Sequence, residues 1–143
     1  MLVGGEESGG IAIKGHIPER DGIWDGLVLL EFMAKTGKKL TELIQEVYDV
    51  VGAFSYNRYD LHLTEEKKQS IIANCQNNTY KAFAGSPITN LETTDGFKYY
   101  LGDDETLMIR PSGTEPVLRV YAEAATPERV TQILDETKAA LLS

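Results

Sequence analysis

The sequence is poor in the residues that build covalent and metal-bound frameworks. Its 143 residues include one cysteine, Cys75, and two histidines. A single cysteine cannot form an internal disulfide, and Cys75 is expected to be a buried or half-buried structural thiol. No group of histidine, cysteine and carboxylate residues has the spacing of metal ligands, so the sequence predicts no metal site in this chain.

Long hydrophobic runs and an export leader are also missing. No stretch of about 18 or more apolar residues occurs, so no membrane-spanning helix is expected. The N-terminus reads Met-Leu-Val-Gly-Gly-Glu-Glu, which has neither the basic start nor the apolar centre of a signal peptide. With the single cysteine, these absences predict a cytoplasmic protein that has no membrane partner.

Basic residues are outnumbered in this chain. Its 14 lysines and arginines stand against 22 acidic residues, for a formal net charge of −8, and no basic cluster stands out. Proteins that bind nucleic acid usually present a basic face to the phosphates, so the composition argues against a nucleic-acid partner. A small phosphorylated ligand stays open, because a few local arginines can hold one phosphate whatever the total charge.

Residues 1–52 carry two helical patterns. Residues 23–35 are apolar nearly all round, which predicts a helix buried on most sides, with Trp24 in the core. Residues 40–51 repeat apolar side chains at steps of three and four, which predicts an amphipathic helix. Two such helices need a sheet to cover, so we interpret residues 1–52 as the helical tail of an α/β domain.

Residues 53–143 show a different order of elements. Alternation and the Asp95-Gly96 turn signal predict strands at residues 54–63, 88–94, 97–101, 106–110 and 117–123. Capping residues predict one helix at 64–77 and another that begins at Thr126-Pro127. This order predicts an α+β domain, in which an antiparallel sheet is covered on one face by two helices.

The segment Arg110-Pro111-Ser112-Gly113-Thr114-Glu115-Pro116 lies between two predicted strands and suits a phosphate. Ser112 and Thr114 offer hydroxyl donors, and Gly113 lets the backbone amides turn toward an anion. Arg110 offers a planar fork for two phosphate oxygens, and alternation along the next strand aims Arg119 at the same site. From residue types alone, a plain hairpin loop with two surface arginines remains the alternative.

A second polar loop reads Gly5-Glu6-Glu7-Ser8-Gly9-Gly10. It matches neither a Walker loop nor a nucleophile elbow. A carboxylate and a hydroxyl held by glycines, at Glu6 and Ser8, can accept and donate hydrogen bonds to neighbouring sugar hydroxyls. A flexible terminal loop with solvated acids is the alternative.

Three further places carry charged or titratable side chains. Arg20, in the run from His16 to Gly22, can pair with an anion or simply belong to a helix N-terminus. His62 is interpreted as structural or exposed. Residues 65–68, which include Lys68, are interpreted as a solvated helical face.

These segments together resemble signatures of the α-D-phosphohexomutase family, the phosphoglucomutases and phosphomannomutases, over essentially the whole chain. The resemblance implies that residues 1–52 are the end of domain three, with its sugar-binding loop. It implies that residues 53–143 are domain four, a TBP-like, phosphate-binding domain. Glu6 and Ser8 would then contact sugar hydroxyls, and Arg20 the substrate. The non-transferring phosphate would be bound by Arg110, Ser112, Gly113, Thr114 and Arg119.

Members of that family move a phosphate between the 1- and 6-positions of hexose phosphates through a hexose 1,6-bisphosphate. Their phosphoserine and their Mg²⁺ loop belong to domains one and two, and neither motif occurs here. The resemblance therefore implies a substrate-binding C-terminal portion with no catalytic residues of its own, inactive without the N-terminal domains. It also implies that domain four rotates about residues 52–55.

Two questions stay open at this level. A free-standing module that binds sugar phosphates is the alternative function, since the transferring serine and the metal loop are not in the sequence. Glucose, mannose and glucosamine phosphates differ only at one carbon, and the Glu-Glu-Ser form of the loop favours glucose.

Overall fold

The computed structural model describes residues 2–5, 9–102, 104–113 and 115–143. The chain divides into two compact units, residues 1–52 and residues 53–143, which are called unit 1 and unit 2 below. In the described part of the chain, no helix is long and apolar enough to cross a membrane.

Unit 1 consists of a short hairpin and two helices. Strand β1 (Val3–Gly5) pairs antiparallel with β2 (Ile11–Ile13), and the helices are α1 (Gly22–Thr36) and α2 (Leu40–Val51). The Asp21 carboxylate caps α1 by accepting hydrogen bonds from the first backbone amides of the helix. Gly37 ends α1 in the left-handed conformation, with a φ of 67°. Both helices therefore lie close to their predicted bounds.

The expected burial of α1 is wrong for this structure. None of the fifteen residues of α1, all of them described, is buried. Leu27 is 56% exposed and Leu30 61% exposed, and Trp24, expected in the core, is 38% exposed. The physical reason is that, within the described part of unit 1, α1 packs against β2 and has few contacts with α2, which is too little surface to cover a helix that is apolar on most sides.

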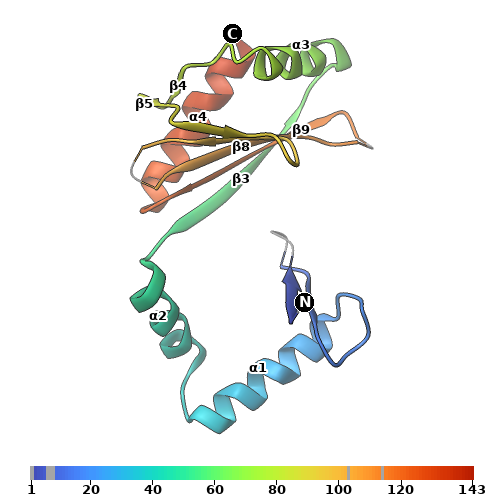
Figure 1. Ribbon diagram of the computed structural model, residues 1–143, viewed down its shortest axis with the longest axis vertical. Coiled ribbons are helices and arrows are strands. Elements are labelled where there is room, and N and C mark those ends of the chain that lie inside the picture. Colours follow the sequence, from blue (N-terminus) through green and yellow to red (C-terminus); the bar gives the residue numbers. More distant parts are fainter. Residues whose placement is uncertain (1, 6–8, 103, 114) are drawn as a thin grey trace. The chain divides into compact units, whose positions relative to one another are not determined.

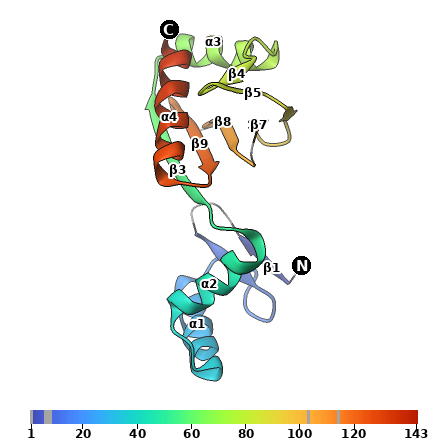
Figure 2. The ribbon, with the colours of Figure 1, turned by 90° about the vertical axis from the view of Figure 1, so that its left-hand side faces the viewer.

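Unit 2 is built on one antiparallel sheet with strand order β3-β9-β8-β7-β6. Its strands are β3 (Ser55–His62), β6 (Asn90–Glu92), β7 (Phe97–Tyr100), β8 (Thr106–Pro111) and β9 (Val117–Ala124). The helices are α3 (Glu65–Gln76) and α4 (Pro127–Leu142), and α4 runs alongside the sheet against β3 and β9 (Figures 1 and 2). The predicted α+β architecture is confirmed.

One face of this sheet forms the core with the two helices. Leu118, Val120 and Ala122, which alternate along β9, are each at most 1% exposed and belong to the core cluster. Ile71 from α3 and Ile133 from α4 belong to the same cluster. Cys75 is a buried free thiol whose pKa is raised by burial, as expected of a structural cysteine.

The opposite face of the sheet is the one that carries the polar residues. Along β9, Arg119 alternates with the core residues, and its cross-strand neighbours are Asp60 on β3 and Arg110 on β8. This face is called the open face below.

The structure adds one element and changes two expectations in unit 2. A small hairpin of β4 (Ala82–Phe83) and β5 (Ser86–Pro87) was not predicted, because two-residue strands leave no periodic signal. Strand β6 is shorter than the predicted strand at 88–94. Lys68, expected on a solvated helical face, has a side chain that is only 9% exposed, because the loop after β8 folds over it.

Candidate functional site

The loop between β8 and β9 is closed by its own hydrogen bonds. The Ser112 amide donates to the Val117 carbonyl at 3.0 Å, and the Val117 amide donates to the Glu115 carbonyl at 2.7 Å. The Glu115 amide donates to the Ser112 hydroxyl oxygen at 3.3 Å, which leaves the hydroxyl hydrogen to point elsewhere. These bonds join the two described arms of the loop and leave the Ser112 hydroxyl as an available donor.

Two arginines lie opposite each other on adjacent strands at the base of this loop. Arg110 on β8 and Arg119 on β9 are direct cross-strand partners on the open face. Like charges directly opposite each other on a sheet destabilise it unless anions neutralise them. Both side chains keep about a third of their surface exposed, 35% for Arg110 and 30% for Arg119. The arrangement is suited to an anion that bridges both groups.

Arg110 is fixed from two sides. Its Nε lies 3.1 Å from one Asp95 carboxylate oxygen and 3.2 Å from the other. A hydrogen bond with the Tyr121 side chain raises the pKa of Arg110, and the charge of Asp95 raises it further. Arg110 is therefore a permanent cation whose plane is set before any ligand arrives.

The turn that presents Asp95 is pressed against Arg110. Gly96 has a φ of +95°, and a Cβ added to it would lie 2.8 Å from the Ile109 carbonyl oxygen and 3.2 Å from the Arg110 Cα. Only glycine fits such a conformation at such a distance. The Asp95-Gly96 turn was predicted from the sequence, but its contact with Arg110 was not.

Arg119 is held less completely than Arg110. One of its terminal nitrogens lies 3.6 Å from the Glu115 carboxylate. Its buried Nε has no hydrogen-bond partner among the residues that the structure describes. A buried, unpaired donor costs free energy, so Arg119 gains more than Arg110 from a further acceptor at this site.

A third arginine on the open face was missed by the sequence analysis. Arg58 on β3 forms an ion pair with Asp60 at 3.0 Å, and its guanidinium lies 6.0 Å from the centre of the Tyr121 ring. The register places Asp60 opposite Arg119 and Arg58 opposite Tyr121. The alternation of β3 showed that Arg58 and Asp60 share a face, but only the register shows which residues they meet.

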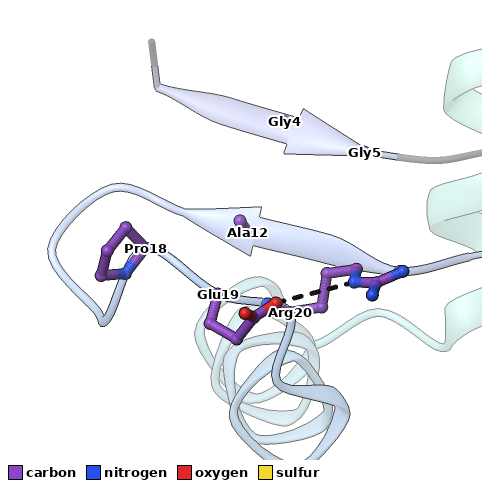
Figure 3. Close-up of a pocket in the computed structure, with 7 residues that line it drawn as sticks. Gly4, Gly5, Ala12, Pro18, Glu19 and Arg20 are labelled. Atoms are coloured by element: carbon purple, nitrogen blue, oxygen red, sulfur yellow. Dashed lines mark hydrogen bonds and ion pairs between the residues drawn. The ribbon is translucent and has the colours of Figure 1, made fainter.

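Unit 1 carries a separate pocket of about 310 Å³. Its walls are the glycine backbones at the ends of β1 and β2 and the run from Pro18 to Arg20 (Figure 3). The Arg20 side chain passes directly over Gly10, where an added Cβ would lie 2.5 Å from the Arg20 Cδ. Its Nε is 3.7 Å from the Glu19 carboxylate. Arg20 thus lies at the loop that was predicted to bind the sugar.

Apart from Arg20, the predicted site residues divide into two sets. Arg110, Ser112, Gly113 and Arg119 come together at the loop after β8. Gly113 has no left-handed φ and a Cβ on it would meet open space, so its predicted part in anion binding stays a prediction. Glu6, Ser8 and Thr114 lie outside the described residues.

The acidic residues near the loop do not fit a metal ion. Asp95, Asp60 and Glu115 are each directed at an arginine rather than at one another. Within the described ranges, no three histidine, cysteine or carboxylate side chains converge as metal ligands would. The Mg²⁺ that the family resemblance implies is therefore not assigned to these residues.

Two family descriptions match this chain in succession. Residues 1–51 match the phosphoglucomutase/phosphomannomutase alpha/beta/alpha domain III, and residues 34–140 match the phosphoglucomutase/phosphomannomutase C-terminal domain. The second match alone covers more than half of the chain, and it includes the loop after β8.

Individual relatives agree with these matches. A phosphoglucomutase/phosphomannomutase of Thermococcus kodakarensis is 32% identical over 93% of this chain and 27% of its own length. A phosphoglucosamine mutase of Methanococcus aeolicus is 37% identical over 94% of this chain and 28% of its own length. The chain thus spans about a quarter of the length of the curated relatives that it matches.

Solved structures show the same likeness. The crystal structure of a putative phosphomannomutase from Thermus thermophilus is 32% identical, with a TM-score of 0.75 over 99% of this chain and 27% of that one. A phosphoglucomutase from Paramecium, 21% identical, shares the fold with a TM-score of 0.65 over 98% of this chain and 29% of that one. Together with the residues gathered at the loop, these matches show that the chain belongs to the phosphoglucomutase/phosphomannomutase family.

Proposed function

We propose that this chain is the substrate-binding C-terminal part of a phosphohexomutase, which interconverts hexose 1-phosphate and hexose 6-phosphate. In this proposal unit 1 is the end of domain three and unit 2 is domain four. The observation that carries it is the cross-strand pair of Arg110 and Arg119 at the base of a loop closed by Ser112. Two adjacent cations and a hydroxyl donor match the oxygens of one phosphate.

The residues of this chain have binding and orienting roles in the proposal. Arg110, Arg119 and the loop at 112–114 hold the phosphate that is not transferred, and Glu6 and Ser8 bind sugar hydroxyls. Arg20 contacts the substrate from the wall of the unit 1 pocket. Mg²⁺, held by another domain, would neutralise the phosphoryl group in transfer. The phosphoserine also belongs to another domain, so we expect this chain alone to lack mutase activity.

The rest of the longer protein is the proposed partner of unit 1. The exposed leucines of α1 have the pattern of a helix that packs against a sheet. This favours a part of a longer enzyme over a free-standing module. A cytoplasmic location and rotation of unit 2 about residues 52–55 belong to the same proposal.

The binding experiment uses the 143-residue chain and backbone amide NMR. Inorganic phosphate and glucose 6-phosphate are expected to shift the amides of Ser112 and Gly113. Arg110→Ala should weaken binding at least tenfold, because a charge-assisted, bidentate contact is lost. Lys98→Ala is the control, since Lys98 is a cation on the same face that stacks on Tyr100 instead. Equal affinities for the two variants would contradict the proposal.

The sugar is tested by the same titration. The Glu-Glu-Ser loop was interpreted in favour of glucose, whereas several relatives are phosphoglucosamine mutases. Glucosamine 6-phosphate carries an amine that a carboxylate such as that of Glu6 can bind as a cation. A tighter complex with glucosamine 6-phosphate than with glucose 6-phosphate, lost in Glu6→Gln, would replace the glucose prediction.

A further inference from the structure

Lys68 on α3 is a buried cation beneath the phosphate loop. Of the lysines and arginines that the structure describes, it is the one in the buried class, with 7% of its surface exposed. Taking an ammonium group out of water costs free energy that must be offset by good partners.

The Lys68 ammonium reaches the returning arm of the loop. Its Nζ lies 3.4 Å from the Glu115 carbonyl oxygen and 3.1 Å from the carboxylate of Glu65, whose side chain is 61% exposed. The Leu63 amide, just before α3, donates to the Pro116 carbonyl at 3.3 Å. The start of α3 and the segment before it are thus attached to the loop at two successive carbonyls.

These contacts offset the burial of the charge only in part. A bond of 3.4 Å is longer than an ordinary hydrogen bond, and a carboxylate that is mostly in water is screened. An apolar side chain of the same length would fill this position at lower cost. We therefore explain the buried charge of Lys68 by its effect on the loop, and not by a contribution to the stability of the core.

We infer that Lys68 is a positioning residue for the phosphate loop, which acts through the Glu115 carbonyl. This inference rests on the proposed function of the loop. The Lys68 Nζ contacts the Glu115 carbonyl, and the Glu115 amide donates to the Ser112 hydroxyl oxygen, so the ammonium and the serine hold the same residue. The ammonium also adds a positive charge next to the Glu115 carbonyl, which favours an anion bound at the loop. It does not contact the phosphate.

The test compares Lys68→Met with Lys67→Met in the 143-residue chain. Lys67 is the matched control, because its Nζ donates to the carbonyl of Ser143, at the C-terminus, and not to a residue of the loop. Without ligand, we expect Lys68→Met to speed hydrogen exchange at the Ser112 and Glu115 amides about tenfold, and the urea midpoint of unit 2 to hold or rise. With inorganic phosphate, we expect about tenfold weaker binding. Lys67→Met should change neither quantity.

A second variant separates the charge from the hydrogen bond. Lys68→Gln keeps a donor and loses the charge, and it protects the test if the methionine variant does not fold. Its donor is one bond closer to the backbone than the lysine Nζ, so we expect exchange of the Glu115 amide between that of the unchanged chain and that of Lys68→Met, and weaker phosphate binding.

The outcomes distinguish this inference from the proposed function. If exchange at Ser112 and Glu115 is the same in the Lys68 and Lys67 variants, or rises only as much as global unfolding does, Lys68 is ordinary structural support and the inference is wrong. If the unchanged chain does not bind phosphate, the proposed function fails, while the exchange of the loop amides still decides the role of Lys68.

Discussion

Arg110 takes its role from its neighbours. Its side chain alone would be a flexible surface cation, yet Asp95 holds its Nε and Gly96 lets the turn come within van der Waals distance of its backbone. The orientation of the guanidinium thus depends on a residue that has no side chain. This makes Gly96 as informative a target as the arginine itself.

Gly96→Ala is expected to destabilise unit 2 by about 1–3 kcal/mol, because the added Cβ meets backbone atoms at a positive φ. The matched control is Gly102→Ala, where an added Cβ would meet nothing within 4 Å. Urea unfolding followed by the tyrosine near-UV signal measures both variants. Equal midpoints would show that the turn relaxes away from β8 without cost.

Thr137→Val is expected to stabilise unit 2 by about 1 kcal/mol, because it removes a buried hydroxyl that lacks a hydrogen-bond partner among the described residues. Thr131→Val on the same helix is the comparison, since the Thr131 hydroxyl is exposed and donates to the Pro127 carbonyl at 3.0 Å. Thermal unfolding should rank Thr137→Val above the unchanged chain. A lower melting temperature would mean that the hydroxyl is paired in solution.

At the residue scale, the sequence predicts a role for a side chain when its residue type alone suits a ligand. Arg110, Ser112 and Arg119 were predicted to bind an anion because of their residue types and alternation, and the structure brings them together at one loop. Lys68 and Asp60 were missed, because their roles depend on strand register and on which helix face the loop covers. Neither property can be obtained from local periodicity.

Among the elements, α4 is connected to the β4–β5 hairpin and to the turn before β8 by one side chain. Arg129, in the first turn of α4, donates to both carboxylate oxygens of Glu105 at 2.7 and 2.8 Å. It also donates to the Ser86 hydroxyl at 2.8 Å and to the Ala84 carbonyl at 3.1 Å. The unpredicted β4–β5 hairpin and the turn before β8 are therefore fixed to the same helix end.

This network predicts a pH dependence of stability. The hydrogen bond from Arg129 is the main cause that lowers the pKa of Glu105. A lowered pKa in the folded state means that the stabilisation is fully present above the unfolded pKa of about 4.3 and is lost as pH falls through the folded value. Glu105→Gln should cost about 1–3 kcal/mol near pH 7.

The measurement is the urea midpoint of unit 2 for both proteins at neutral pH and at about pH 3. The difference between the unchanged chain and Glu105→Gln should shrink at the lower pH, because Glu105 is then being protonated. If the difference in urea midpoint is the same at both pH values, the effect of Glu105→Gln arises from packing and not from the charge.

The two helices and the longer strands of unit 2 were predictable because their signals are local. Caps at Thr64 and Thr126 marked both helices, and the Asp95-Gly96 turn marked a hairpin. The exposure of α1 was not predictable from its own apolar residues, because burial also depends on which other elements pack against the helix. In the described part of unit 1, few residues pack against α1.

The whole molecule combines two units of unequal burial. Within the described part of unit 1, Leu43 is the one buried apolar residue, whereas unit 2 contains the continuous core cluster. Buried apolar area is the main source of stability, so unit 1 should be the weaker unit. The distribution of aromatic residues allows the two to be followed separately.

Unit 1 is expected to unfold at a lower urea concentration than unit 2. The single tryptophan, Trp24, reports on unit 1 through its fluorescence, and every tyrosine except Tyr48 lies in unit 2. Two separate transitions, tryptophan first, are the expected result, and their order does not depend on the choice of denaturant. Coincident transitions would show that the units unfold as one cooperative body.

The carboxylates that hold the arginines have a consequence for kinetics. Arg110 and Arg119 already face Asp95 and Glu115, so under the proposed function a bound phosphate would take over contacts that the chain itself supplies. When the phosphate departs, the carboxylates take those contacts back, and no bare pair of cations is left behind. Such an internal exchange of counter-ions lowers the barrier to dissociation, so we expect short residence times. Under the same proposal, a reaction intermediate that must leave this loop and bind again through its other phosphate would be released quickly.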